Sequence, residues 1–362
     1  MIMHVVGNRP QLIKLAPLSR ELHKRGYEDI IIHTGQHYDE NMSDIFFNEL
    51  GIEKPYKNLR IGSGSHAQMT GMALMELEKL MNDISPSAVV VYGDTNSTLA
   101  AALAAVKLDI PIVHIEAGPR TYAKNNPEEI NRTLVDHISK ILCCPDRDSV
   151  ENLKKENIME GVFFTGDIMH DTFLYCKKKG NKEILEKYNV DKEEYVLMTC
   201  HRQENTNSKE RMNKILNFIV RINDQVLCPL HPRTKKMLEI FGLWEKALKI
   251  ENLKIVEPIG YMDMVALMND CKYVLCDSGG VSKETYFAKK RCLFMLKFNP
   301  WKELVNREHI ITIDFDDSRD RSDKIKIANA VKGTEDCNNG DLFGDGTTSE
   351  QVVEILKTYK LI

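Results

Sequence analysis

Short apolar segments alternate with helix-like segments along most of the chain, and this alternation restricts the fold more than any other feature. We assign strands to nine apolar segments, at residues 3–6, 29–34, 88–92, 110–116, 195–199, 225–230, 253–257, 273–276 and 291–295. Strands that are apolar on both faces and separated by helices are typical of a parallel sheet covered on both sides. The sequence therefore predicts an α/β fold of the doubly wound type.

The alternation occurs twice, which predicts two Rossmann-like domains in a chain of 362 residues. A lysine-rich stretch at residues 176–192 separates the two halves. Helices are expected at residues 10–25, 97–107 and 281–289, and Pro17 is expected to kink or interrupt the first. A final amphipathic helix at residues 349–361 is expected to begin with a serine cap.

The composition favours neither nucleic acid nor a membrane as partner. The net charge is −4, and no segment approaches the roughly 18–20 apolar residues that span a bilayer. Nine cysteines without a CxxC pair favour buried free thiols and a reducing compartment. The first residues have the pattern of a strand and not of a signal peptide. We therefore expect a cytoplasmic protein.

Polar side chains follow the strands of the first half, at the sheet edge where ligands bind in open α/β folds. Arg9 and Lys14 flank the start of the first helix, whose free N–H groups attract anions. These residues predict an anion site, and a tight turn with two surface cations is the alternative. Residues 34–37 follow the second strand.

Three carboxylates lie further along the first half, at the end of a strand or the start of a helix. Either Asp94 or Thr95 could simply cap the helix that follows the third strand. Glu116 ends a buried strand, where a carboxylate requires a partner or a function. Glu128 opens another helix, and acidic residues are ordinary in a first turn. Each carboxylate is thus a candidate for chemistry with a structural alternative.

The second half places titratable groups in the same way. His201 and His231 each follow a strand beside an arginine, which points to an anionic ligand, although either histidine alone could be structural. Residues 277–280 (DSGG) join a strand to a helix, and two glycines at a helix N-terminus predict a phosphate cradle. An ordinary Asp or Ser cap is the alternative. Glu284, in the following helix, could accept hydrogen bonds from sugar hydroxyls, and the spacing of His and Cys predicts no metal site.

Eight motifs in order give the sequence a family resemblance. They are GNRPQLIKLAP, HTGQHYDENM, VVVYGDTNSTLAAALAA, HIEAGPR, PEEINR, CHRQEN, LHPRT and DSGGVSKE. Together they resemble the non-hydrolysing UDP-N-acetylglucosamine 2-epimerase family across residues 7–284. Some details resemble the branch that acts on UDP-2,3-diacetamido-2,3-dideoxyglucuronate, namely Gln11, residues 62–71, Lys283 and residues 301–305.

The resemblance implies a GT-B architecture of two Rossmann-like domains facing a cleft, with no cofactor and no metal. The first domain would comprise residues 1–170 with 346–362, and the second, which binds UDP, residues 171–345. The implied reaction inverts C2 of a UDP-activated 2-acetamido sugar by eliminating UDP and adding it back. A homodimer and a place in polysaccharide biosynthesis are also expected.

The resemblance also carries roles over to individual positions. Asp94, Glu116 and Glu128 match the carboxylates that move the C2 proton. His201 is grouped with these catalytic residues and also matches a diphosphate contact. The remaining matches are to UDP or substrate contacts, at Arg9, Lys14, Arg120, His231, Ser278, Gly279, Gly280 and Glu284, the last being the ribose ligand.

Two departures from the family pattern bear on function. Residues 296–300 (LKFNP) replace the usual segment that helps to hold the nucleotide, and Ser65-His66 replace an Arg-Gln pair of allosterically activated members. The first departure keeps open the alternative of a non-catalytic UDP-sugar-binding protein. A GT-B glycosyltransferase, which would share the fold and the UDP cradle, and a hydrolysing relative are two further alternatives. The second departure argues against activation by a further substrate molecule.

Overall fold

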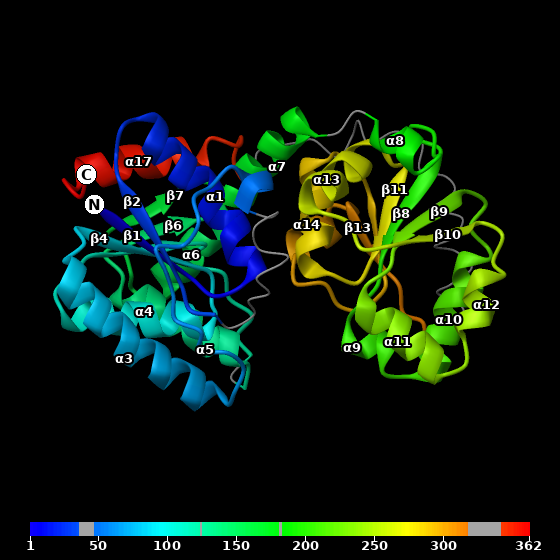
Figure 1. Cartoon of the computed structure of the whole chain (residues 1–362), viewed down its shortest axis with the longest axis horizontal. Coiled ribbons are helices and arrows are strands. Elements are labelled where there is room, and N and C mark those ends of the chain that lie inside the picture. Colours follow the sequence, from blue (N-terminus) through cyan, green and yellow to red (C-terminus); the bar gives the residue numbers. More distant parts are fainter. Residues whose placement is uncertain (36–46, 124, 181–182, 318–341) are drawn as a thin grey trace. The chain divides into compact units, whose positions relative to one another are not determined.

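The chain forms two compact units, each with its own parallel sheet. The computed structural model describes residues 1–35, 47–123, 125–180, 183–317 and 342–362 (Figure 1). The first unit comprises Met1–Tyr175 with Asp341–Ile362, and the second comprises Cys176–Gly340. The sequence placed these boundaries at 170/171 and 345/346. Of the predicted segments, most of HTGQHYDENM lies outside the described residues.

The first unit is built on a seven-stranded sheet in the order β3-β2-β1-β4-β5-β6-β7, with parallel pairing throughout. Its strands are β1 (Ile2–Val6), β2 (Asp29–His33), β3 (Lys57–Asn58), β4 (Ala88–Tyr92), β5 (Ile112–Ile115), β6 (Ile141–Cys144) and β7 (Val162–Phe164). Its helices are α1 (Arg9–Lys24), α3 (His66–Ile84), α4 (Asn96–Lys107), α5 (Pro127–Ile138), α6 (Arg147–Lys155), α7 (Ile168–Lys179), which runs into the second unit, and α17 (Thr348–Thr358). Helices α3, α4 and α5 pack side by side, as do α1 and α17 (Figure 1).

The second unit repeats this strand order in a six-stranded parallel sheet, β10-β9-β8-β11-β12-β13. Its strands are β8 (Tyr195–Thr199), β9 (Gln225–Pro229), β10 (Leu253–Val256), β11 (Tyr273–Cys276), β12 (Cys292–Phe294) and β13 (Ile310–Thr312). Its helices are α8 (Ile184–Lys187), α9 (Gln203–Thr206), α10 (Lys209–Ile219), α11 (Pro232–Ile240), α12 (Trp244–Leu248), α13 (Tyr261–Asp270), α14 (Gly279–Phe287) and α15 (Lys302–Asn306). The predicted two-domain α/β fold is confirmed.

The strand order reverses between β1 and β4 in the first sheet and between β8 and β11 in the second. Connections leave these paired strands in opposite directions, which opens a crevice at their carboxyl ends, where ligands bind in open α/β sheets. The candidate site residues follow these four strands, β5 and β9.

Of the two outcomes predicted for Pro17, a kink or an interruption of the first helix, the interruption is wrong, because α1 runs continuously from Arg9 to Lys24. Proline lacks the N–H that would bond the carbonyl four residues earlier, which belongs to Ile13. The hydroxyl of Thr172 in α7 donates to that carbonyl at 2.7 Å. A side chain from another helix thus replaces the missing backbone bond.

The predicted serine cap of the last helix is also wrong. Ser349 lies inside the first turn of α17, whose N-cap is Thr347. The buried carboxylate of Asp171 instead accepts from the backbone N–H of Thr348 at 3.1 Å and of Ser349 at 2.7 Å. The orphan donors of α17 are therefore satisfied by α7, which fastens the C-terminal segment to the first unit.

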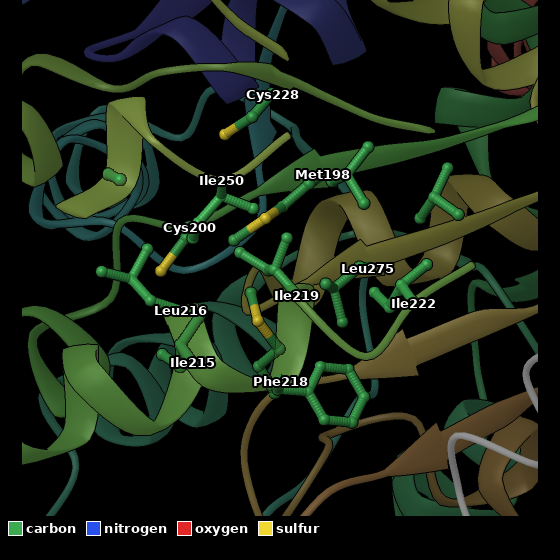
Figure 2. Packing of buried hydrophobic residues seen from close by; sticks show 14 of the residues in the cluster. Met198, Cys200, Ile215, Leu216, Phe218, Ile219, Ile222, Cys228, Ile250 and Leu275 are labelled. Atoms are coloured by element: carbon green, nitrogen blue, oxygen red, sulfur yellow. The ribbon is translucent and has the colours of Figure 1, made fainter. Parts of the chain in front are cut away.

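The core of the second unit packs α10 against the sheet with aliphatic and sulfur-containing side chains. Figure 2 shows Met198 and Leu275 from the sheet meeting Ile215, Leu216 and Ile219 of α10. The eight cysteines within the described residues are all free and buried. No helix among the described residues is long and apolar enough to cross a bilayer.

Candidate active site

In the first unit, the helix start that follows β1 is capped and has the cations that were predicted for an anion site. Asn8 caps α1 through its side chain, which accepts from the N–H of Gln11 at 3.1 Å, and a proline occupies the first turn. Arg9 is exposed at this end, and Lys14 lies about one turn further on. The free N–H groups, the helix dipole and the exposed guanidinium all favour an anion here.

Gln11 fixes this turn to the one that follows β4. Its amide oxygen accepts from the N–H of Gly7 at 2.7 Å, and its amide nitrogen donates to the carbonyl of Tyr92 at 2.7 Å. The same nitrogen lies 3.0 Å from the Thr95 hydroxyl. A buried side chain thus joins the carboxyl ends of the two strands at the topological switch point, a role that the sequence did not reveal.

Glu116 ends β5 and pairs with Lys14, with 2.6 Å between the carboxylate and the ammonium. Its backbone has φ +70°, which side chains other than glycine rarely adopt. Strain of this kind persists where the surrounding structure enforces it, and it gathers at functional sites. The predicted candidates Lys14 and Glu116 are therefore brought together.

Gly93 leaves the space beside this ion pair open. It has φ +61°, and a β-carbon on it would lie 3.3 Å from the Lys14 ammonium and 3.7 Å from the Glu116 carboxylate. A side chain would crowd the pair and strain the turn. The turn that carries Asp94 can therefore approach both charged groups.

Asp94 does not cap the next helix, because Thr95 does so by accepting from the N–H of Thr98. The Asp94 carboxylate instead forms an ion pair with Arg132 of α5. Arg132 also contacts Glu129 at 2.9 Å. The ion pair thus holds the Asp94 carboxylate in one place, where it could take part in proton transfer or bind a polar substrate group.

The two acidic residues at the start of α5 have different surroundings. Glu128, the predicted candidate, is exposed. Glu129 is buried and accepts from the N–H groups of Thr121 at 3.0 Å and Tyr122 at 2.7 Å. Burial alone would raise the pKa of Glu129, but these hydrogen bonds and Arg132 outweigh it and lower the pKa. Glu129 therefore holds the preceding loop, and Glu128 remains accessible.

Arg120 lies in a buried network of charges. It donates two bonds to Glu156, at 2.7 and 2.8 Å, and one to Asp136 at 2.7 Å. Its side chain is 1% exposed. This placement accounts for Arg120 structurally, and its contact with a substrate stays a prediction.

In the second unit, Asp277 fixes the loop that follows β8. Its fully buried carboxylate accepts from the N–H groups of His201 at 3.0 Å and Arg202 at 2.9 Å, and from the amide of Asn205 at 3.0 Å. The helix cap is Ser278, which accepts from the N–H of Val281. Asp277 thus joins the carboxyl ends of β8 and β11, as Gln11 joins those of β1 and β4.

His201 and His231 lie together, with their ring centroids 5.3 Å apart. His231 caps α11 by accepting from the N–H of Arg233 at 3.2 Å. Burial lowers the pKa of His231, and His201 adds to this shift. An anion between or beside the two rings would favour protonation of His231, because it would offset the repulsion from His201.

The predicted phosphate cradle lies at the start of α14, and Glu284, the residue predicted to bind the ribose, lies further along the same helix. Gly279 and Gly280 form its first turn, after the Ser278 cap. Glu284 is buried and accepts from the hydroxyl of Tyr261 at 2.8 Å. The N–H groups at the helix start favour a phosphate, and the carboxylate is oriented by a second side chain.

Residues 296–300, which depart from the family pattern, and the adjoining Trp301 pack directly against this cradle. The indole N–H of Trp301 donates to the carbonyl of Gly279 at 2.7 Å, and Asn299 donates to the hydroxyl of Ser282 at 3.0 Å. The Lys283 ammonium lies 4.1 Å from the centre of the Trp301 ring. Lys297, the cation of the departing segment, is exposed and pairs with Asp314 at 3.4 Å.

Comparison with known proteins agrees with this architecture. The family model described as UDP-N-acetylglucosamine 2-epimerase matches residues 20–357. The chain belongs to this family. Its members are UDP-sugar 2-epimerases, so the chain is an isomerase, and its fold is of the GT-B type.

Individual relatives cover nearly the whole chain. A UDP-N-acetylglucosamine 2-epimerase homolog of Methanococcus maripaludis is 45% identical over 98% of this chain and 99% of its own. A UDP-2,3-diacetamido-2,3-dideoxy-D-glucuronate 2-epimerase of Pseudomonas aeruginosa is 40% identical over 98% of this chain and 99% of its own. A crystal structure of the Methanocaldococcus jannaschii UDP-GlcNAc 2-epimerase with UDP-GlcNAc and UDP is 38% identical, covers 99% of both chains, and has a TM-score of 0.85.

Proposed function

We propose that this epimerase-family enzyme interconverts UDP-N-acetylglucosamine and UDP-N-acetylmannosamine. The observation that carries the proposal is the cluster of Glu116, Lys14 and Gly93 at the carboxyl end of β5, with Asp94 on the adjoining turn. The epimerase of M. jannaschii, which binds UDP-GlcNAc and UDP, supports the choice of substrate.

The reaction needs a base on one face of C2 and an acid on the other. A carboxylate removes the C2 proton while the C1–O bond to the diphosphate breaks, which leaves a C1–C2 double bond and free UDP. UDP then adds back at C1 while a proton reaches C2 on the opposite face. Glu116, Asp94 and Glu128 are the groups that we assign to these two transfers.

UDP must be stabilised as a leaving group and retained for its return. Backbone N–H groups at the start of α14 and the cationic side chains Arg9 and His201 would neutralise the developing phosphate charge. Glu284, oriented by Tyr261, would accept from the ribose hydroxyls. We also expect a cytoplasmic homodimer that acts in polysaccharide biosynthesis.

A second substrate, UDP-2,3-diacetamido-2,3-dideoxyglucuronate, is favoured by one observation. Lys283 and Trp301, two of the residues that resemble that branch, are in direct contact at the nucleotide cradle, and the relative that acts on this sugar is 40% identical. The chemistry at C2 is the same for both sugars, so the roles of the carboxylates do not depend on this choice.

The test is to incubate each UDP-sugar separately with the enzyme in deuterated buffer and to follow C2 by proton NMR. We expect loss of the C2 proton signal, with the epimer appearing, for one of the two sugars at a much higher rate. Absence of exchange with both would overturn the proposal. Release of a free sugar would indicate a hydrolase, and transfer to an acceptor without exchange would indicate a glycosyltransferase.

A further inference from the structure

Both ring nitrogens of His114 face oxygen atoms, in a part of the first unit that is fully buried. Nδ1 lies 2.6 Å from a carboxylate oxygen of Asp136 in α5, and Nε2 lies 2.7 Å from the carbonyl oxygen of Gly93. The side chains of His114 and Asp136 are both 0% exposed. Neither the family resemblance nor the reaction assigns this histidine a role.

The partners of the ring decide its protonation. A carbonyl oxygen can only accept, so Nε2 must carry a proton. The other oxygen of Asp136 accepts from the N–H of Gly118 at 3.1 Å and from Arg120 at 2.7 Å. Burial alone would raise the pKa of Asp136, but His114 and Arg120 outweigh it and lower the pKa, so Asp136 is a carboxylate. A carboxylate also only accepts, so Nδ1 carries a proton as well.

We propose that His114 is a buried imidazolium that positions the Gly93–Asp94 turn of the epimerase site. This inference rests on the proposed function for its catalytic meaning, whereas the charge state itself can be measured without any substrate.

The charges around the ring support a cation. Arg120 is shared between Asp136 and Glu156, and His137 also contacts Glu156, at 3.3 Å. Burying the charge of Asp136 without compensation is costly, and a protonated His114 places a cation directly beside it. The thiols of Cys143 and Cys144 on the neighbouring strand β6 add no charge, because burial raises their pKa values.

The ring holds one of three consecutive carbonyls in the turn after β4. The carbonyl of Tyr92 accepts from Gln11 at 2.7 Å, that of Gly93 from His114 at 2.7 Å, and that of Asp94 from Asn131 at 2.9 Å. A hydrogen bond from a charged donor is stronger than one from a neutral donor. His114 therefore acts as a positioning residue for Asp94 and for the space beside Glu116.

The charge state is tested by NMR of enzyme with ¹⁵N-labelled histidine at pH 8, where an ordinary imidazole with a pKa of about 6.5 is neutral. We expect one ring with both nitrogens protonated, absent from the His114→Gln variant. In Asp136→Asn, which has lost the carboxylate, the same ring should become neutral. This second variant assigns the signal to His114 even if His114→Gln does not fold. A wild-type spectrum with every ring neutral overturns the proposal.

The positioning role is tested by deuterium exchange at C2. His114→Gln should lower the maximal rate by roughly 100-fold, as expected when catalytic groups shift by about 1 Å, while UDP affinity stays within about twofold. His137→Gln, next to Asp136 in α5 but half-exposed, is the matched control and should keep the wild-type rate. Equal rates for the two variants would overturn the positioning role, whereas a wild-type enzyme without exchange would instead refute the proposed function.

Discussion

Lys14 and Glu116 form an ion pair of 2.6 Å, although one residue lies in α1 and the other directly after β5. The two side chains are 11% and 16% exposed, so water screens the attraction between the two charges only in part. The ammonium holds the Glu116 carboxylate beside Gly93, at the carboxyl end of β5. Replacing this carboxylate should therefore impair proton transfer.

We predict that Glu116→Gln lowers C2 exchange by at least about 100-fold, because an amide cannot accept the proton. Affinity for UDP should change by no more than a few-fold, since the nucleotide is assigned to other residues. Deuterium exchange and calorimetric titration with UDP measure the two effects. Glu354→Gln, an exposed change in α17, should alter neither; comparable losses of exchange and UDP affinity in Glu116→Gln would make Glu116 a structural residue.

We predict that Trp301→Phe weakens UDP binding about fivefold, because the bond from the indole N–H to the Gly279 carbonyl is lost. The aromatic ring beside Lys283 is retained, so the change tests the hydrogen bond. Trp244→Phe is the same substitution on α12, away from the cradle, and should leave UDP affinity unchanged. Titration calorimetry compares the two variants, and equal affinities would show that residues 296–301 do not support the cradle.

We predict that the second unit loses stability as the pH falls from 7 to 5, in part through His309. Burial lowers the pKa of His309 to about 4, and Arg291 adds to the shift. The unfolded chain binds this proton near pH 6.5, so protonation favours unfolding and costs about 2 kcal/mol between pH 7 and pH 5.

The variant His309→Phe keeps an aromatic ring beside Tyr286 but cannot titrate. Between pH 7 and pH 5, the free energy of unfolding of this variant should fall by about 2 kcal/mol less than that of the wild type. Both tryptophans, Trp244 and Trp301, lie in the second unit, so denaturant unfolding followed by tryptophan fluorescence reports on it. Identical pH slopes for the two proteins would contradict the assignment.

We predict that Thr172→Val destabilises the first unit by about 1–3 kcal/mol, because the carbonyl of Ile13 loses its buried donor. In a Pro17→Ala background the cost should shrink, since the new backbone N–H at position 17 can bond that carbonyl. Denaturant unfolding followed by circular dichroism gives the double-mutant cycle. Additive effects would mean that Thr172 does not compensate for the proline.

The order of strands and helices follows from local sequence wherever a strand is a continuous apolar run of four or five residues. Ala88–Tyr92, Tyr195–Thr199 and Tyr273–Cys276 were predicted with their observed limits. The prediction missed the short strands β3, β7 and β13, because two or three residues carry no measurable periodicity. It also left the apolar run of β6 unassigned.

Only those site residues that follow a strand could be predicted from the sequence. Lys14 and Glu116 could be nominated because each follows a strand, but their pairing depends on the sheet order. Gln11 and Asp136 act through contacts between distant elements, and neither lies at a strand end. His114, the partner of Asp136, did carry a local signal, because it is a polar residue inside an apolar strand.

The Asp171 carboxylate binds the N–H groups at the start of α17, a helix that is synthesised only after the whole second unit. The first unit therefore lacks one of its own helices while the second unit is synthesised, on the order of ten to forty seconds at typical rates of translation. During that interval α1 has no α17 to cover it. The nascent first domain should consequently present an apolar face to chaperones until α17 has been made.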